Sequence, residues 1–456
     1  MMLLSKAARA MSGCLLGDDA VFNDVGTDSR KVQRGELFFA LKGEHFDGHQ
    51  YAEQALKLGA VAVVVSDEAC LARPAILVKD TLLALGEFAK AWRLQFNVPV
   101  IGVTGSNGKT TIKEMITAIL VAKTGSTKEV LATVGNLNNH IGLPLTLLKM
   151  REHHQYAVLE MGMNHLGEID YLTHIAKPTV ALIGNAGTAH IGELGSRDNI
   201  AKAKGEIFAG LDNKGVAIIN ADDAYANYWF SLNVNRKVLS FGLKNNADVS
   251  ARVEINVDGR QQIQLQSLVG EFEFSLDLMG EHNVRNALAA CAVAIALNIP
   301  LKVIAQAFEK FGGVAGRLTR IAGFNGALVI DDTYNANPDS MKAAIDVLAT
   351  QAGTKVMIMG DMAELGVDAP QLHAEIGKYA KQKGIEMFYT LGENSQLAAE
   401  AFEGCAQAFS EAELLVNAVK NKMNERSVVL VKGSRFMKME RIVNSIIQHP
   451  IYREAH

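Results

Sequence analysis

The sequence lacks several features that mark secreted, membrane-spanning or nucleic-acid-binding proteins. Its four cysteines are scattered and form no C-x-x-C pair, which argues against a disulfide framework or a zinc site and favours a reducing compartment, the cytoplasm. The N-terminus is too briefly apolar for a signal peptide, and the longest apolar run, 287–297, is shorter than the roughly 20 residues that a bilayer requires. The net charge of −4 supplies no basic excess, so we expect neither general nucleic-acid binding nor membrane insertion.

What the sequence does contain is enough apolar residues for several α/β domains. Its 456 residues predict three domains at roughly 150 residues each, and 49% hydrophobic residues are ample for packed cores. We predict the α/β class, with a small N-terminal domain over 1–96, a central P-loop domain with a parallel sheet over 97–314, and a Rossmann-like doubly wound domain over 315–456. Apolar and polar residues alternate from 248 to 278 around a turn at Asp258-Gly259, which predicts antiparallel strands within the central domain. The third domain has four strand-like runs, each followed by a helical segment: 327–331, 355–360, 387–391 and 428–432.

The stretch from 98 to 123 has the order of a phosphate-binding P-loop. An apolar run precedes the loop Thr-Gly-Ser-Asn-Gly-Lys-Thr-Thr at 104–111, and apolar residues at helical spacing follow it. Small residues let backbone N–H groups surround a phosphate, Lys109 can reach the β- and γ-phosphates, and the Thr110 hydroxyl can bind Mg²⁺. The pattern G-x-x-x-x-G-K-[ST] fails because Val103 occupies the first glycine position, whereas T-G-x-x-G-K-T holds. A glycine-rich turn with a solvated lysine is the alternative, but the agreement of strand, loop and helix favours a nucleotide site.

Polar residues lie where further strands of the central domain are predicted to end. Glu160 ends an apolar run, and in a parallel sheet ligands gather at that end, so Glu160 is a candidate Mg²⁺ ligand. His190 follows another such run, although a single loop histidine is more often without a ligand. Lys202 and Lys204 would ordinarily lie on a solvated helix face. A lysine beside Mg²⁺ could instead add CO₂ and become a carbamate, a step that sequence patterns do not reveal.

Two further regions combine ligand-binding chemistry with a structural alternative. Arg30 and the loop 42–49 could hold a diphosphate, although an ordinary N-cap and surface loop is slightly favoured by the pattern. His282, Asn283 and Asn286 could contact an adenine edge, or Asn283 could cap the helix that follows.

Three polar turns follow strands of the third domain, at 332–338, 361–366 and 432–435. By the strand-end rule we expect them to face one crevice and to form a site for a second ligand. The alternative is ordinary loop chemistry, since Asn-Pro and Gly-Asp are turn formers.

These stretches resemble the Mur ligases, ATP-dependent enzymes that form amide bonds in peptidoglycan synthesis and are related to folylpolyglutamate synthetases. The resemblance covers essentially the whole chain, and 104–110 resembles the family's version of the P-loop. Sister ligases that add a single amino acid, such as diaminopimelate or lysine, tend to carry Asp-Tyr-Ala-His in place of 331–338 and are the nearest alternative. A P-loop NTPase switch and a P-loop kinase are alternatives from other classes. Four stretches are similar to the branch that joins D-alanyl-D-alanine to UDP-N-acetylmuramoyl-tripeptide: 28–30 with 35–44, 136–139, 331–338 and 360–366.

The resemblance implies a role for each matching residue, with ATP and Mg²⁺ as cofactors. It also implies small-molecule substrates as the partners, a monomer, and a site completed when the third domain closes. The residues implied in catalysis are Lys109, Asn139, Glu160, His190 and Lys202. Those implied in ATP binding are Thr104, Gly105, Ser106, Asn107, Gly108, Lys109, Thr110, Thr111, His282, Asn283, Asn286, Arg317 and Asp332. Those implied in substrate binding are Ser29, Arg30, Gly43, Asp47, His49, Asn138, Asn139, Ser434 and Arg435. The implied metal ligands are Thr110, Glu160, His190 and Lys202, the last as a carbamate, with Lys204 close in register as the alternative to Lys202.

Overall fold

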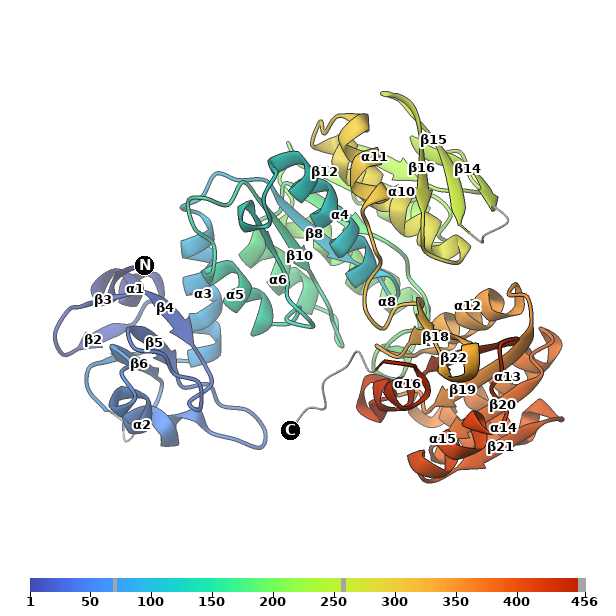
Figure 1. Cartoon of the computed structure of the whole chain (residues 1–456). Helices are drawn as coiled ribbons and strands as arrows, with labels where there is room; N and C mark the ends of the chain where they lie inside the picture. The colour runs from blue at the N-terminus through green and yellow to red at the C-terminus, as the bar shows by residue number, and fades with distance from the viewer. Residues whose placement is uncertain (69–71, 256–259, 450–456) are drawn as a thin grey trace.

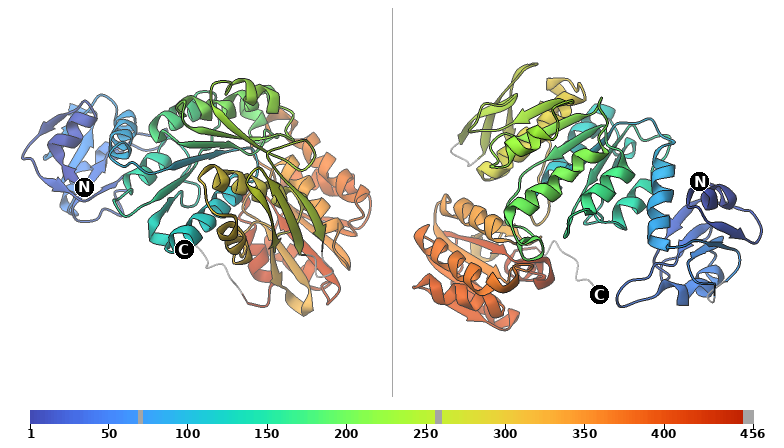
Figure 2. Two further views of the ribbon diagram at one scale, coloured as in Figure 1. Left: turned by 90° about the horizontal axis from the view of Figure 1, so that it is seen from above. Right: turned by 180° about the vertical axis from the view of Figure 1, so that it is seen from behind.

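The chain folds into three α/β bodies that follow one another in sequence order (Figure 1). The computed structural model describes residues 1–68, 72–255 and 260–449, so the predicted turn at Asp258-Gly259 lies outside the described residues. The N-terminal body stands at one end of the molecule, whereas the middle and C-terminal bodies lie against each other in all three views (Figure 2). Each of the larger sheets falls inside one predicted segment, and we propose 1–96, 97–314 and 315–456 as the domain limits on that ground.

The N-terminal body is built on a five-stranded sheet with the order β2-β7-β6-β5-β4. Strands β5 and β6 lie inside this sheet, and all their residues are buried because both faces of the sheet are covered. The elements are β1 (Met2–Leu3), α1 (Leu4–Ala10), β2 (Cys14–Leu16), β3 (Val21–Phe22), β4 (Asp24–Gly26), β5 (Glu36–Phe39), α2 (Ala52–Lys57), β6 (Ala62–Val65), β7 (Ala75–Leu77) and α3 (Thr81–Arg93).

The middle body has a nine-stranded sheet with the order β16-β15-β14-β13-β12-β11-β8-β10-β9. Strands β8 to β13 are parallel, and β14, β15 and β16 add the antiparallel extension that the alternating pattern predicts. Its strands are β8 (Val100–Thr104), β9 (Val130–Ala132), β10 (Tyr156–Glu160), β11 (Val180–Ile183), β12 (Val216–Asn220), β13 (Lys237–Phe241), β14 (Val249–Ile255), β15 (Gln261–Ser267) and β16 (Gly270–Leu276). Its helices are α4 (Lys109–Thr124), α5 (Gly142–Leu148), α6 (Glu168–Ala176), α7 (Ile191–Leu194), α8 (Arg197–Gly205), α9 (Ala226–Ser231), α10 (Glu281–Ala296) and α11 (Leu301–Glu309).

The order of the middle sheet positions the P-loop. Strand β8 lies between β10 and β11, with Glu160 beside Val103 and Ile183 beside Thr104. The carboxyl ends of these three strands therefore open on one edge of the sheet, where the P-loop also lies. Helix α4 follows that loop, and the apolar face predicted from its spacing is buried: Ile112, Met115, Ile116, Ile119 and Leu120.

The C-terminal body is a doubly wound sheet with the order β17-β18-β22-β19-β20-β21, in which β17 alone is antiparallel among the described strands. The three predicted polar turns follow β18, β22 and β19, which are neighbours, so their loops share one edge. Strands β17 and β21 are short edge strands that lack the continuous apolar run of the four predicted ones. The elements are β17 (Thr319–Ala322), β18 (Leu328–Asp332), α12 (Pro338–Ala349), β19 (Thr354–Gly360), α13 (Ala369–Gln382), β20 (Met387–Leu391), α14 (Glu393–Phe402), β21 (Ala406–Phe409), α15 (Ala412–Lys420), β22 (Ser427–Lys432) and α16 (Glu440–Ile446).

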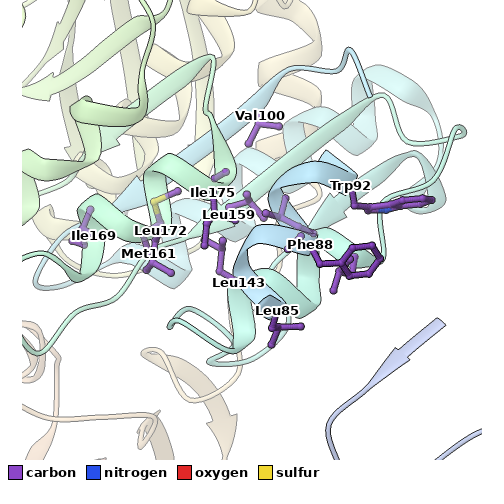
Figure 3. Close-up of a cluster of buried hydrophobic side chains, with 14 of the residues drawn as sticks. Leu85, Phe88, Trp92, Val100, Leu143, Leu159, Met161, Ile169, Leu172 and Ile175 are labelled. Atoms are coloured by element: carbon purple, nitrogen blue, oxygen red, sulfur yellow. The ribbon is translucent and has the colours of Figure 1, made fainter. Parts of the chain in front are cut away.

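Helix α3 joins the N-terminal body to the middle one. Figure 3 shows Leu85, Phe88 and Trp92 among side chains of the middle body such as Leu143 and Leu172. The Trp92 indole N–H donates to the Met150 carbonyl at 3.1 Å, and the Arg93 side chain donates to the Ala176 carbonyl at 3.1 Å. The two bodies thus share one apolar core across the sequence boundary near residue 96. No helix in the described ranges combines the length and the apolar character that crossing a bilayer would need.

Candidate functional site

A cavity of about 960 Å³ lies where the middle and C-terminal bodies meet. Strand-end loops of both bodies line it, as the strand-end rule predicts. The predicted site residues that line this cavity are Ser106, Asn107, Gly108, Lys109, Thr110, Thr111, Asn138, Asn139, Glu160, His190, His282, Asn283, Asn286, Arg317, Asp332 and Arg435. The predicted site residues outside its lining are Ser29, Arg30, Gly43, Asp47, His49, Thr104, Gly105, Lys202 and Ser434.

The P-loop has the geometry that phosphate binding requires. Gly108 precedes α4 with φ of +80°, and a Cβ there would come within 2.4 Å of the Asn286 side-chain oxygen, so both backbone and space demand glycine. The Lys109 ammonium donates to the Gly105 carbonyl at 2.8 Å, which folds the side chain back over the loop. Burial lowers the pKa of Lys109, Glu160 opposes that shift and Arg317 adds to it. A polyanion in the loop would supply negative charge to this half-buried lysine.

Thr110 and Glu160 form the part of the site that suits Mg²⁺. The Thr110 hydroxyl donates to Glu160 Oε2 at 2.9 Å, and Asn138 Nδ2 donates to Glu160 Oε1 at 2.8 Å. Both Thr110 and Glu160 are buried, and a hydroxyl and a carboxylate are hard oxygen donors of the kind that Mg²⁺ prefers beside nucleotide phosphates. These two residues therefore fit the predicted metal role.

His190 has a different partner in this structure. Its Nδ1 lies 2.8 Å from a carboxylate oxygen of Glu364, on the loop after β19 of the C-terminal body. This histidine pairing lowers the pKa of Glu364, more than its burial raises it. Among the described residues no three His, Cys, Asp or Glu side chains gather closely enough to hold a metal ion. The role of His190 as a metal ligand stays a prediction.

The position of Lys202 does not fit its predicted role, and Lys204 lies near the site instead. On α8 the Lys202 side chain is exposed, whereas Lys204 is 1% exposed. Burial and then the charge of Lys109 lower the pKa of Lys204 well below its ordinary value, while Asp223 acts in the opposite direction. Residues two apart on a helix point in nearly opposite directions, so only one of the two lysines can face Lys109.

The predicted adenine contacts lie together at the start of α10. Asn286 Nδ2 donates to the Asn283 side-chain oxygen at 3.1 Å, and Asn283 Nδ2 donates to the Met279 carbonyl at 2.8 Å. Asn283 thus does not cap the helix N-terminus, which begins after Gly280 without a side-chain cap. Burial, with help from Arg285, lowers the pKa of His282 to about 4, so the ring is neutral at pH 7 and can both donate and accept hydrogen bonds.

Asn139 is predicted to act in catalysis and substrate binding, but its side-chain oxygen has a local structural use. It accepts from the backbone N–H groups of Ile141 and Gly142, at 3.2 and 2.9 Å, and so stabilises the turn that begins α5. Asn139 lines the cavity next to Asn138, so its place agrees with the prediction while its contribution to chemistry stays untested.

The C-terminal body reaches the P-loop directly. Arg317 Nη2 donates to the Thr110 hydroxyl at 3.0 Å, and Asn337 Nδ2 donates to the Asn107 side-chain oxygen at 2.8 Å. The Thr188 hydroxyl donates to Asp339 at 2.9 Å. The two bodies are therefore closed on each other around the cavity, and Arg317 is one of the residues that contact across it, while its predicted role in ATP binding stays a prediction.

Asp332 is turned toward its own body rather than toward the P-loop. The Lys432 ammonium donates to its carboxylate at 2.6 Å and to the Asn335 carbonyl at 2.8 Å. Ser434 likewise accepts from the Ala363 N–H at 2.8 Å, so its hydroxyl ties two strand-end loops together. Arg435 lines the cavity and pairs with Glu440 at 3.2 Å.

The predicted substrate residues of the N-terminal body lie apart from this cavity. Arg30 is exposed and its guanidinium pairs with both oxygens of Asp28, at 2.9 and 3.0 Å. His49 is buried, with Nδ1 at 2.6 Å from Asp47 and Nε2 accepting from the Ser66 N–H at 3.0 Å. Both ring nitrogens of His49 are thus engaged within the fold. The roles of Ser29, Arg30, Gly43, Asp47 and His49 in substrate binding stay predictions.

Several residues of the site escaped prediction from sequence. Asn185 holds the P-loop by accepting from the Asn107 N–H and donating to the Asn107 carbonyl, both at 2.9 Å. Glu364 and Lys432 lie in strand-end turns that the sequence marks as a group, without showing which side chain meets which. The strand-end position was the available signal; the partners depend on how the two bodies meet.

Comparisons with known proteins agree on one family across the whole chain. The profile for the Mur ligase middle domain matches 103–294, that for the Mur ligase glutamate ligase domain matches 316–435, and that for the Mur ligase family catalytic domain matches 22–93. A Haemophilus influenzae UDP-N-acetylmuramoyl-tripeptide–D-alanyl-D-alanine ligase is 41% identical, covering 96% of this chain and 97% of that protein. The Bacillus subtilis protein of the same name is 38% identical, covering 95% of each chain.

Solved structures give the same result. The crystal structure of MurF from Acinetobacter baumannii matches with a TM-score of 0.88 and 38% identity, covering 96% of this chain and 97% of that one. The structure of a Thermotoga maritima MurF ligase in complex with ADP matches with a TM-score of 0.83 and 28% identity, over 93% and 97% of the two chains. With matching profiles in all three bodies and relatives of this similarity along nearly its full length, the chain belongs to the Mur ligase family.

Proposed function

We propose that this protein is an ATP-dependent ligase that joins D-alanyl-D-alanine to UDP-N-acetylmuramoyl-tripeptide and releases ADP and phosphate, in peptidoglycan precursor synthesis. The observation that carries the proposal is the single cavity in which a P-loop faces the strand-end turns of a second doubly wound body. An NTPase switch would need the P-loop alone, whereas a ligase needs a second ligand next to the γ-phosphate. The relatives that match over nearly the whole chain bear the name of this ligase.

The reaction must first make a carboxylate reactive. The carboxylate of the tripeptide attacks the γ-phosphate of ATP, and the acyl phosphate that forms is open to attack by an amine. Both reactants are anions, so their charge repulsion is a large part of the barrier. Lys109, which donates to the Gly105 carbonyl, and Arg317, which donates to the Thr110 hydroxyl, place positive charge at the P-loop, where the phosphates would bind. Mg²⁺, held by Thr110 and Glu160, would neutralise further phosphate charge.

The second step needs a closed site. The free amine of D-alanyl-D-alanine attacks the acyl carbon, and phosphate leaves. Water would hydrolyse the acyl phosphate if it could enter. The contacts of Arg317 with Thr110, Asn337 with Asn107 and Asp339 with Thr188 hold the bodies together around the reacting groups.

Lys204 is our candidate for the carbamate that the family resemblance implies at Lys202. Only a neutral amine adds CO₂, and the buried position that lowers the pKa of Lys204 increases the neutral fraction. The resulting carbamate would place a negative charge next to Lys109. The exposed Lys202 has neither property.

We also propose that the enzyme works as a cytoplasmic monomer on small-molecule substrates. The three cysteines within the described residues, Cys14, Cys291 and Cys405, are free, as is usual in a reducing compartment.

Phosphate release that depends on the acceptor amine tests the function. The purified protein is given ATP, Mg²⁺ and UDP-N-acetylmuramoyl-tripeptide, then D-alanyl-D-alanine, lysine or diaminopimelate, and the product is weighed by mass spectrometry. We expect phosphate and a new pentapeptide only with the dipeptide. The Lys109→Ala variant should lose this activity, by about 100-fold or more, and still bind the UDP substrate.

Three outcomes would contradict the proposal in different ways. A product with a single amino acid would identify a sister ligase. Phosphate release without any amine would indicate an NTPase, and a phosphorylated product without free phosphate would indicate a kinase. Full activity of Lys109→Ala would mean that the P-loop lysine plays no part in the reaction.

A further inference from the structure

Arg317 is a cation without a carboxylate partner among the described residues, although it is half-buried. The only hydrogen bond of its side chain to the described residues runs from Nη2 to the Thr110 hydroxyl, and its buried Nε has no hydrogen-bond partner among them. The charge of Lys109 acts on this site with the same sign, whereas the Glu160 carboxylate is linked to Arg317 through the Thr110 hydroxyl, which donates to it. A flexible side chain in this position needs something else to hold it.

The ring of Tyr334 supplies that support. The guanidinium carbon of Arg317 lies 4.0 Å from the centre of the Tyr334 ring, the distance of a close cation–π contact. The backbone keeps the two in register, because the Tyr334 N–H donates to the Gly316 carbonyl at 3.1 Å. Gly316 has φ of +72°, and a Cβ there would come within 3.3 Å of the Tyr334 nitrogen, so the approach is close. Both Arg317 and Tyr334 line the cavity.

An aromatic ring can orient Arg317 without neutralising its charge, which a carboxylate would do. A carboxylate would orient Arg317 and also neutralise it, so less of its charge would reach a phosphate. A ring face attracts the guanidinium while leaving its net charge and its outer N–H groups available. We propose that Tyr334 is a positioning residue, whose ring holds Arg317 against Thr110 with its charge free for the phosphates of ATP. This inference rests on the proposed function.

The test compares two replacements of Tyr334 in the full-length enzyme. Tyr334→Phe keeps the ring face and should keep kcat within about two-fold, whereas Tyr334→Leu keeps an apolar group without the ring and should lower kcat roughly 5- to 30-fold. The Kd of ADP should stay within about two-fold in both, because Arg317 acts on the phosphate that is transferred. In an Arg317→Gln background, adding Tyr334→Leu should lower kcat by less than a further factor of about two.

Other outcomes would overturn the inference. Weaker ADP binding with unchanged kcat in Tyr334→Leu would mean that the ring contacts the nucleotide base. An equal loss with and without Arg317 would mean that the ring only supports the fold. If Tyr334→Leu does not fold, phenylalanines carrying one or three fluorines at position 334 weaken the ring face at nearly constant shape, and kcat should fall with fluorine number; a constant kcat would refute the role.

The wild-type enzyme separates this inference from the function itself. Absence of acceptor-dependent phosphate release in the wild type would reject the proposed ligase. Normal ligation by the wild type, with Tyr334→Leu equally active, would reject only the role of Tyr334.

Discussion

Lys202 and Lys204 differ in their surroundings although two positions separate them on one helix. Lys204 is buried, and the charges of Lys109 and Asp223 act on it, whereas Lys202 is exposed. This makes them a matched pair, because either can be replaced within the same helix by the same residue. At the scale of single residues, charge and burial rather than residue type decide which lysine can serve the reaction.

We expect Lys204→Ala to lower ligase activity by about 100-fold or more, because it removes the group that would carry charge next to Lys109. Lys202→Ala should change activity less than about two-fold and stability by less than about 0.5 kcal/mol, as for an exposed site. Acceptor-dependent phosphate release measures both. A larger loss in Lys202→Ala than in Lys204→Ala would reverse the assignment.

His282 should make stability depend on pH. Its pKa falls from 6.5 to about 4 on folding, chiefly through burial and further through Arg285 and Lys432, against Glu281 and Asp346. The unfolded chain therefore binds the proton more readily, so the stabilisation present above pH 6.5 is lost as the pH falls toward 4, by at most about 3 kcal/mol.

Urea unfolding between pH 7.5 and pH 4.5 measures this slope, and His282→Gln serves as the comparison. As the pH falls, the unfolding free energy of the wild type should decrease more steeply than that of the variant. Parallel curves for the two proteins would show that His282 is not the titrating group.

At the scale of elements, the N-terminus of α12 does two things at once. The Asn337 side-chain oxygen accepts from the Ser340 N–H at 2.9 Å in a capping box, and its nitrogen donates to Asn107 in the P-loop. One residue thus stabilises a helix of the C-terminal body and contacts the nucleotide loop of the middle body. Helix α12 therefore borders the second ligand crevice and also contacts the P-loop when the two bodies are closed.

Asn337→Ala should cost about 1 kcal/mol of stability through the lost cap and should also lower kcat. Asn337→Ser should recover most of the stability, since serine caps helices well, but not kcat, because its hydroxyl is too short to replace the contact with Asn107. Urea unfolding and steady-state kinetics separate the two effects. Recovery of kcat by serine would mean that capping alone matters.

At the scale of the whole molecule, the N-terminal and middle bodies share a hydrophobic core, whereas the C-terminal body packs largely around its own. One apolar cluster runs from the N-terminal body through α3 into the middle body and contains Phe88. The C-terminal body has two further clusters, and in the one that also includes Met279 of the middle body the rings of Phe388 and Phe402 stack with their centres 5.1 Å apart. The N-terminal and middle bodies should therefore lose structure together, and the C-terminal body separately.

Phe88→Ala and Phe402→Ala test this division, since each removes a buried ring at a cost of roughly 3–5 kcal/mol. In calorimetry, we expect Phe88→Ala to lower the transition that binding of ADP raises, and Phe402→Ala to lower the other. A single transition that both variants shift equally would mean that the molecule unfolds as one unit.

The sequence alone determined the elements whose pattern is local. The P-loop from Gly105 to Thr110, the apolar face of α4 and the four parallel strands of the third domain follow from spacing, because period and turn chemistry are written in neighbouring residues. The family resemblance likewise rested on contiguous stretches. Short edge strands such as β17 and β21 escaped, because each has only four residues, with polar residues among the apolar ones.

The tertiary structure alone decided which side chains meet. Helix α8 has one large apolar residue, Ile200, so its sequence gives no clear phase, and packing decided that Lys204 rather than Lys202 is buried. The contacts of Arg317 with Tyr334 and of Asn337 with Asn107 join residues far apart in sequence, and they exist only because two bodies close on each other. Local pattern fixes where an element begins and ends, whereas the partner of a side chain depends on the arrangement of every element between them.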